Sequence, residues 1–189
     1  MSTSYDLHLT GDADADALLS SNPLALLVGM LLDQQVPMEW AFSSPLRLQE
    51  RMGESLTATA VASRGPDAVE ELFRQKPALH RYPGSMAKRT HRLCQYLVEE
   101  YGAEPTTLWA DVATGKDLLK RLTDLPGYGK QKAQIFVALL GKQCGITPDG
   151  WRDAAGDYGK DGHRSIADVV SPQSLDRVRE YKRAKKAAG

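Results

Sequence analysis

A turn with the sequence LPGYGKQK lies past the middle of the chain and combines residue types that bind phosphate. Gly127 and Gly129 allow positive φ angles and a close approach of the backbone, and Pro126 fixes the direction of the chain. A helix that begins after Gly129 has unpaired amide groups in its first turn, beside the positive charges of Lys130 and Lys132. The segment therefore predicts either a phosphate-binding turn or a sharp corner between two helices with glycine at a helix end.

Asp149 is the second residue of chemical interest, in a Pro-Asp-Gly triplet eighteen residues beyond Gln131. A fixed carboxylate can stabilise a developing positive charge and can orient or deprotonate a water molecule. An aspartate in such a triplet is, taken alone, more often a turn residue or a helix N-cap. The residue type by itself leaves both interpretations open.

The elements that must position these groups are helices, because apolar residues recur at spacings of three and four and no long stretch alternates. The pattern predicts an all-α protein, with helices near 117–122 and 130–140 on the two sides of the turn. Further helices are expected near 67–75, 86–101 and 108–112, and from Pro172 with Ser171 as N-cap.

A strongly apolar helix is predicted from Pro23 to about Gln35, with Asn22 as N-cap, and Pro37 begins the next helix. The apolar run from Leu24 to Leu32 is about half of the roughly 20 residues that span a bilayer, so we expect a core helix and no membrane association. The N-terminus lacks the pattern of a secretion signal, which favours a cytoplasmic location.

The composition excludes several classes of protein. The 24 Lys and Arg residues balance the 24 Asp and Glu residues, so a polyanion must be bound by a local basic surface. Cys94 and Cys144 cannot supply the four thiolates of an iron–sulfur cluster or an all-cysteine zinc site, and the histidines have no metal-ligand spacing with them. We therefore expect neither an iron–sulfur cluster nor a metal bound by side chains.

The turn and its surroundings resemble a known family. LPGYGKQKA, followed after the next helix by the loop GITPDG, resembles the helix-hairpin-helix motif of the HhH-GPD superfamily of DNA glycosylases, in which that loop ends in an aspartate. LVGMLLDQQVPMEWA resembles an earlier helix of the family, after which a glutamine fills the space left by an extruded base; Gln34 and Gln35 stand at that place. The resemblance covers about residues 24–150 and looks closest to an uncharacterised-type bacterial branch without an iron–sulfur cluster.

The resemblance implies two helical lobes with the active site in the cleft between them. We expect a central lobe over 24–140, which ends in the helix-hairpin-helix at 117–140. The second lobe would then be formed by both ends of the chain, 1–23 and 141–189. The family also implies a monomer that binds double-stranded DNA containing a modified base, with no cofactor except a possible monovalent cation held by carbonyl groups of the hairpin.

The chemistry that the resemblance implies is hydrolysis of an N-glycosidic bond, with Asp149 as the catalytic carboxylate. Lyase activity requires an amine at the place of Gln131, so a monofunctional glycosylase that leaves an abasic site is expected. Lys130 and Lys132 are turned by about 100° from that place on the helix, and neither is expected in the same cleft. The rival hypothesis is a non-catalytic helix-hairpin-helix DNA-binding protein in which Asp149 is merely a cap.

Other candidate residues come partly from the resemblance and partly from the types of residue that a base pocket or a DNA backbone requires. Met30 stands where adenine-removing relatives have an acid, so the preferred base is one that leaves easily: a modified uracil such as 5-hydroxymethyluracil, or uracil, and next an alkylpurine. Asp33 is either a pocket acid or an ordinary helix-end residue.

The predicted substrate pocket comprises Gln131, Met30, Ile135 and Trp151. The predicted DNA contacts are Gln34, Gln35, Leu125, Gly127, Gly129, Lys130 and Lys132. Two basic helix faces are either further DNA contacts or solvated surfaces: Lys88, Arg89 and Arg92, and Arg177, Arg179, Lys182, Arg183, Lys185 and Lys186.

Overall fold

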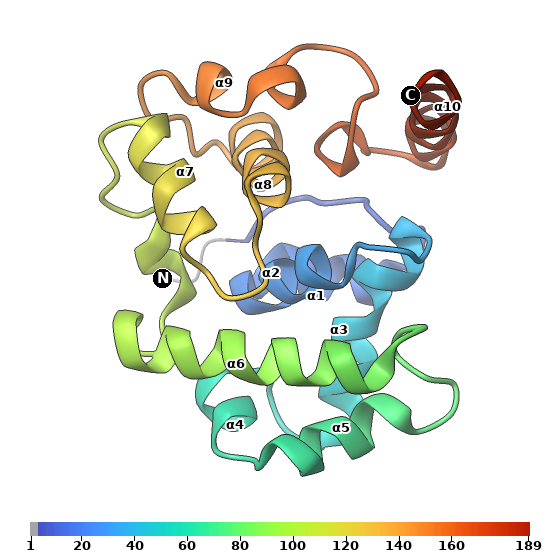
Figure 1. Ribbon diagram of the computed structural model, residues 1–189, viewed down its shortest axis with the longest axis vertical. Helices are drawn as coiled ribbons and strands as arrows, with labels where there is room; N and C mark the ends of the chain where they lie inside the picture. The colour runs from blue at the N-terminus through green and yellow to red at the C-terminus, as the bar shows by residue number, and fades with distance from the viewer. Residues whose placement is uncertain (1–3) are drawn as a thin grey trace.

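Helices dominate residues 4–189, the part of the chain that the computed structural model describes (Figure 1). This range contains ten α-helices and three short 3-10 helices, and it has no β-strand. The all-α prediction is confirmed.

The first two helices meet at a single capping residue. α1 (Ala13–Ser21) ends and α2 (Pro23–Leu32) begins at Asn22, whose side-chain oxygen accepts hydrogen bonds from the amides of Leu24 and Ala25. A proline at the first helical position needs no amide partner, which is why Asn22-Pro23 starts a helix so reliably. The predicted start of this helix is therefore confirmed, and its end comes at Leu32, three residues earlier than expected.

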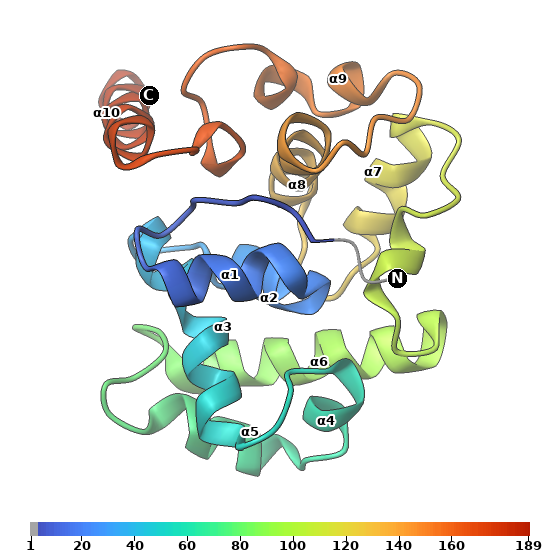
Figure 2. The same ribbon diagram turned by 180° about the vertical axis from the view of Figure 1, so that it is seen from behind.

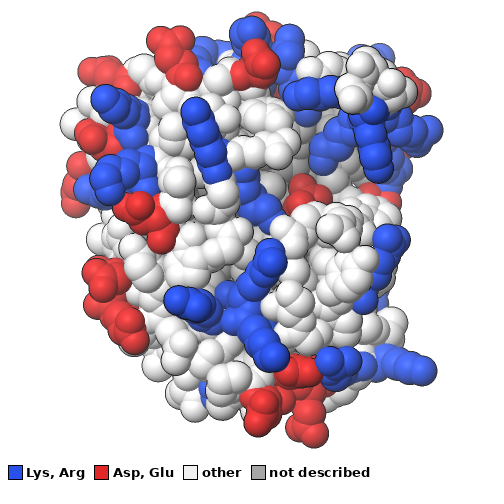
Figure 3. Space-filling view, viewed as in Figure 1, with Lys and Arg blue, Asp and Glu red and all other residues white. Residues whose placement is uncertain are grey.

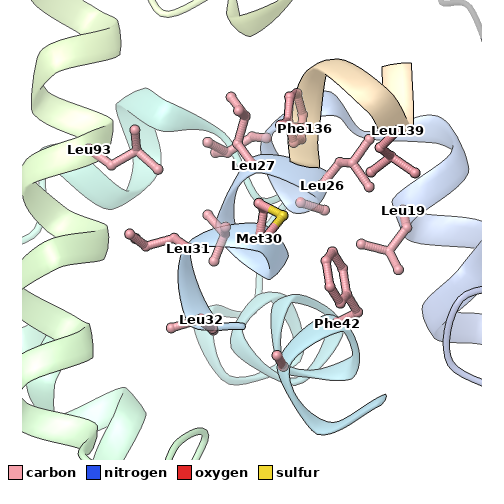
Figure 4. Close-up of a cluster of buried hydrophobic side chains, with 14 of the residues drawn as sticks. Leu19, Leu26, Leu27, Met30, Leu31, Leu32, Phe42, Leu93, Phe136 and Leu139 are labelled. Carbon is pink, nitrogen blue, oxygen red and sulfur yellow. The ribbon is translucent and has the colours of Figure 1, made fainter. Parts of the chain in front are cut away.

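α2 is the centre of the core. Every residue from Leu24 to Leu32 is buried, and Figure 4 shows side chains from α1, α3 (Met38–Met52), α6 and α8 converging on it. α3 packs directly on α2, since a Cβ added at Gly29 would lie 2.5 Å from a ring carbon of Phe42. No single helix in residues 4–189 is long and apolar enough to cross a bilayer, and α1 with α2 passes that test only as a sharply bent pair.

α4 (Ala58–Ala62) and α5 (Pro66–Arg74) pack on one side of the long helix α6 (Pro83–Tyr101), and α2 packs on α6 as well. The apolar stripe predicted for α6 is present: Met86, Leu93 and Leu97 are buried. In Figures 1 and 2, α4, α5 and α6 form the lower part of the molecule, and α1 and α2 lie above them.

The remaining elements form the upper part. They are the 3-10 helix η1 (Pro105–Leu108), α7 (Gly115–Thr123), α8 (Lys130–Gln143), α9 (Trp151–Ala154), η2 (Gly156–Gly159), η3 (Ile166–Asp168) and α10 (Pro172–Ala188). Ser171 caps α10 as predicted. The helix expected at 108–112 is absent because Trp109 leaves the helical path at φ −126° and buries its ring against Phe136.

The packing differs from the predicted division into lobes. α1 packs on α2 and α3, whereas α8 packs on α7, α9, η2 and η3. The hairpin thus shares its contacts with the C-terminal segment, and the first helix belongs with α2 and α3. The sequence pattern could not indicate this, because the amphipathic face of a helix does not identify the helix that will cover it.

Candidate active site

The hairpin between α7 and α8 has the geometry that the phosphate-binding interpretation requires. Leu125 is buried and anchors the turn, and Gly127 has a φ of +84°, a left-handed conformation that favours glycine. Gly129 is the N-cap of α8 and brings no side chain to the first amides of that helix. Gly129 and Lys130 are exposed, so an anion has access to this end of the helix.

A cleft of about 630 Å³ lies beside the turn. One wall comes from the end of α2, from α6 and from the hairpin, and the other comes from the segment after α9 and from α10. Figure 3 shows basic side chains over α6, beside the hairpin and over α10 on this face. The lining residues are Met30, Asp33, Gln34, Arg89, Gly127, Gly129, Gln131, Lys132, Ile135, Tyr158, Arg164, Tyr181, Lys182, Lys185 and Lys186.

Asp33 is the one carboxylate among these lining residues. It is the C-cap of α2, and its side chain is only 7% exposed. Burial raises the pKa of this carboxyl, because the charged form loses its hydration; the positive charges of Lys182 and Lys132 oppose the rise, and Glu39 adds to it. Lys182 Nζ lies 4.0 Å from Asp33 Oδ2. A desolvated carboxylate beside ammonium groups is an arrangement typical of catalytic sites.

The turn that bears Asp33 is held from one side by His80. The Nε2 atom of this buried ring lies 3.1 Å from the Leu32 carbonyl oxygen and 3.0 Å from the Gln34 carbonyl oxygen, and its Nδ1 accepts the amide of Tyr82. These bonds require the proton on Nε2, which donates to the two carbonyls that flank Asp33. Burial lowers the pKa of His80, and the two backbone bonds oppose that change.

Lys132 holds the same turn from the other side. Its Nζ donates to the Leu31 carbonyl oxygen at 2.6 Å and to the Gln34 side-chain oxygen at 3.2 Å. Burial lowers the pKa of this amine to about 8, and Asp33 partly offsets the effect. The expectation that Lys132 would stay out of the cleft is wrong: its long side chain crosses to the end of α2, so the direction of its Cα–Cβ bond does not decide where the amine lies. Lys130 remains exposed and does not line the cleft.

Gln34 and Gln35, the two glutamines expected to fill the space left by an extruded base, have different environments. Gln34 lines the cleft, and its side chain is engaged by Lys132. Gln35 is exposed and has a φ of +58°, a left-handed conformation that costs a non-glycine residue roughly 1–2 kcal/mol. Backbone strain of this kind is often kept at functional sites, and Gln35 is the exposed residue of the two.

Three of the four predicted pocket residues lie together. Met30 and Ile135 give the cleft an apolar surface, and both are buried. Gln131 lies near the start of α8, and its amide nitrogen donates to the Tyr158 hydroxyl at 2.8 Å. The cleft therefore combines an apolar surface with an amide and a phenol, which suits a flat polar heterocycle.

Asp149 does not enter the cleft, contrary to the prediction. Its amide donates to the Ala113 carbonyl and its own carbonyl accepts from the Gly115 amide, which pairs the loop with the N-terminal end of α7. Roughly 13 Å of helix, at 1.5 Å per residue, separates that end of α7 from the hairpin turn. The prediction failed because α8 continues to Gln143, and the short loop that remains does not return along the helix to its start.

Trp151 is also outside the cleft. Its ring packs on Gly141 of α8, where an added Cβ would lie 2.4 Å from ring carbons, and its backbone contacts Gly115 of α7 equally closely. The residue joins α7, α8 and α9 as a packing group. An aromatic residue placed near a hairpin in sequence gives no signal that separates these two roles.

The sequence predicted only part of the cleft wall that the segment after α9 and α10 form. Lys182, Lys185 and Lys186 stood out as a basic helix face, but Tyr158, Arg164 and Tyr181 gave no signal. Tyr158 lies in η2, within the segment 156–162, which contains three glycines. Among residues 4–189, no three His, Cys, Asp or Glu side chains come together in a way that would hold a metal ion.

Comparison with known proteins identifies the family of this chain. The family model of the HhH-GPD superfamily base excision DNA repair proteins matches residues 28–188, which include the second half of α2, the hairpin and α10. No curated protein matches the chain. Members of the superfamily are DNA glycosylases that act in base excision repair. The chain belongs to the HhH-GPD superfamily.

Proposed function

We propose that this protein hydrolyses the N-glycosidic bond of a modified base that is extruded from double-stranded DNA into the cleft, with Asp33 as the catalytic carboxylate. The observation that supports it is the position of Asp33. It is buried at the end of α2 and faces the same cleft as the hairpin turn, with lysines on both sides. Asp149, the residue that the resemblance to the family implies for this role, is exposed and outside that cleft.

The reaction requires a negative charge that is already in place. Loss of the base leaves positive charge on the sugar, as in other glycoside hydrolyses, and a fixed carboxylate stabilises it without reorganisation. Ionised Asp33 can supply that charge and orient the attacking water. The water oxygen bonds to the sugar carbon as the bond from that carbon to the base nitrogen breaks, and the proton that the water loses passes to the departing base. Lys182 and Lys132 favour the ionised form of the carboxyl, and His80 and Lys132 fix the turn that bears it.

The lining of the cleft favours a uracil-type base. The imide edge of uracil presents one N–H donor between two carbonyl acceptors, and the side-chain amide of Gln131 offers both a donor and an acceptor. The Tyr158 hydroxyl lies next to this amide, and Met30 and Ile135 contact the cleft as apolar groups. We propose a modified uracil such as 5-hydroxymethyluracil, or uracil, as the substrate, with an alkylpurine as the next choice.

The reaction is proposed to stop at the abasic site. Gln131 cannot form a Schiff base, and the amine of Lys132 is engaged with two acceptors on the α2 side, the Leu31 carbonyl and the Gln34 side chain. These contacts support a monofunctional glycosylase.

A substrate panel tests the proposal. Duplexes that each carry one altered base, covering uracils, alkylpurines and mismatched adenine, are incubated with the protein and treated with alkali, which cuts the strand at an abasic site. We expect cutting at the uracil-type duplexes, and no cutting when alkali is omitted. Binding to every duplex without cutting of any of them would instead establish the non-catalytic DNA-binding protein.

A further inference from the structure

The C-terminal helix α10 is attached to the molecule mainly through its first half. Leu175 and Val178 are buried, and Ser171 and Ser174 form a capping box at its start. From Lys182 to Ala188 every residue is exposed. The second half of α10 therefore lies against the cleft without a hydrophobic contact surface of its own.

Polar contacts hold this half in place. Just before this half the guanidinium of Arg179 pairs with Glu39 of α3, and within it Lys182 approaches Asp33. Further along, the Lys185 ammonium lies 5.6 Å from the centre of the Tyr158 ring. Contacts made by exposed cations such as Lys182 and Lys185 contribute little to stability, so this half of the helix positions cations at the mouth of the cleft more than it strengthens the fold.

These cations add to others across the cleft. Tyr181, Lys182, Lys185 and Lys186 line it from α10, and the spacing of these residues places them on one face of the helix. The lining residues include six Lys or Arg side chains and one carboxylate, although the chain as a whole has no net charge. Like charges that converge on a cleft repel one another until an anion enters, so this arrangement favours a polyanionic occupant.

We propose that the second half of α10 is a basic arm that binds the phosphates of the DNA strand entering the cleft, opposite the hairpin. The basic arm is defined by Lys182, Lys185 and Lys186. The proposal rests on DNA as the partner of the cleft and adds a second phosphate-binding wall to the one that the hairpin provides. A strand bound on both sides of the cleft would be held while one of its nucleotides is extruded.

The same helix supplies a matched control. Arg177 and Arg183 do not line the cleft, and Arg177 lies beside His163 on the outside. Removing these two charges changes the net charge of α10 by as much as removing Lys185 and Lys186. Non-specific attraction between DNA and a basic helix would make the two pairs equivalent, whereas the basic arm predicts that only the pair lining the cleft contributes to phosphate binding.

The test compares the double variants Lys185→Gln/Lys186→Gln and Arg177→Gln/Arg183→Gln for binding to an undamaged duplex at several salt concentrations. Each phosphate contact that is lost lowers the slope of log Kd against log salt by about 0.9. We expect the first pair to lower the slope by about 2 and the second to leave it unchanged. The single variant Lys186→Gln, which alters one exposed side chain, should lower it by about 1.

Equal slopes for the two double variants, or no change in either, would overturn the basic arm. Because the duplex is undamaged and no base is removed, the result does not depend on catalysis. Failure of the substrate panel would leave this comparison intact, and failure of this comparison would leave the proposed reaction intact.

Discussion

Asp33 terminates the most buried helix of the molecule, and the pKa of its carboxyl is raised chiefly because burial removes water from the charged form. If the ionised form supports base removal, the rate falls as the pH drops through this raised pKa. The acid limb of the pH–rate profile should therefore lie above the ordinary aspartate value of about 3.9. Single-turnover rates measured across the acid range give the apparent pKa of this limb. An apparent pKa at the ordinary aspartate value would show that a solvated carboxyl controls the rate.

The same burial predicts a gain in stability when the charge is removed. Because the pKa is raised in the folded state, the folded protein loses stability as the pH rises through that pKa. Asp33→Asn should therefore unfold at a higher urea concentration than wild type at neutral pH, and the difference should shrink as the pH falls. Asp149→Asn, at an exposed position, provides the control and should change the midpoint little.

Lys132 gives a third test at this scale, since an amine with a pKa of about 8 in the cleft is the group that would form a Schiff base. Its two hydrogen bonds to the α2 side predict no covalent product. Borohydride treatment of the protein with DNA that contains a preformed abasic site should yield no trapped complex. A trapped complex that disappears in Lys132→Arg but persists in Lys130→Arg would make the protein a lyase.

The spacing of residues in the sequence placed some of the site residues correctly and others incorrectly, and the difference has a physical reason. Met30, Gln34 and Gln131 lie on α2, on the turn after it, or on α8, whose positions follow from local helical geometry. Asp149 follows a loop, and its position depends on how many residues the preceding helix takes up. Because α8 continues to Gln143, eighteen residues are too few to return to the cleft.

At the scale of elements, helix starts were predictable wherever a capping residue precedes proline, as at Asn22-Pro23 and Ser171-Pro172. Caps act within a few residues of the chain, so they are visible in the sequence. Which helix packs on which depends instead on residues that are far apart in the sequence. Neither the contact of α1 with α3 nor the placement of α8 against the C-terminal segment has a counterpart in the sequence pattern.

The close contact of α2 with α3 makes a prediction of its own. A methyl group at Gly29 would collide with the Phe42 ring at 2.5 Å, so Gly29→Ala should destabilise the fold by about 1–3 kcal/mol through overpacking. Gly65→Ala is the control, because Gly65 has a φ of −65° and open space around it. Urea unfolding compares the two, and equal midpoints would show that α2 and α3 are less closely packed than the structure has them.

On the scale of the whole molecule, the site depends on parts of the chain that lie far apart in the sequence. The end of α2 provides the carboxylate, the hairpin provides the proposed phosphate-binding turn, and α10 provides the opposite wall. The neutral total charge conceals this arrangement, because acidic side chains elsewhere balance the cations of the cleft. Composition therefore excluded a uniformly basic protein but could not locate the basic surface.

The most direct test of Asp33 as the catalytic carboxylate is a single-turnover measurement of base removal, with enzyme in excess over a duplex that wild type cuts. Asp33→Asn should slow base removal by about 10²- to 10⁴-fold. Asp149→Asn should remain within about threefold of wild type, as expected for an exposed residue outside the cleft. A full rate in Asp33→Asn together with a large loss in Asp149→Asn would contradict the assignment.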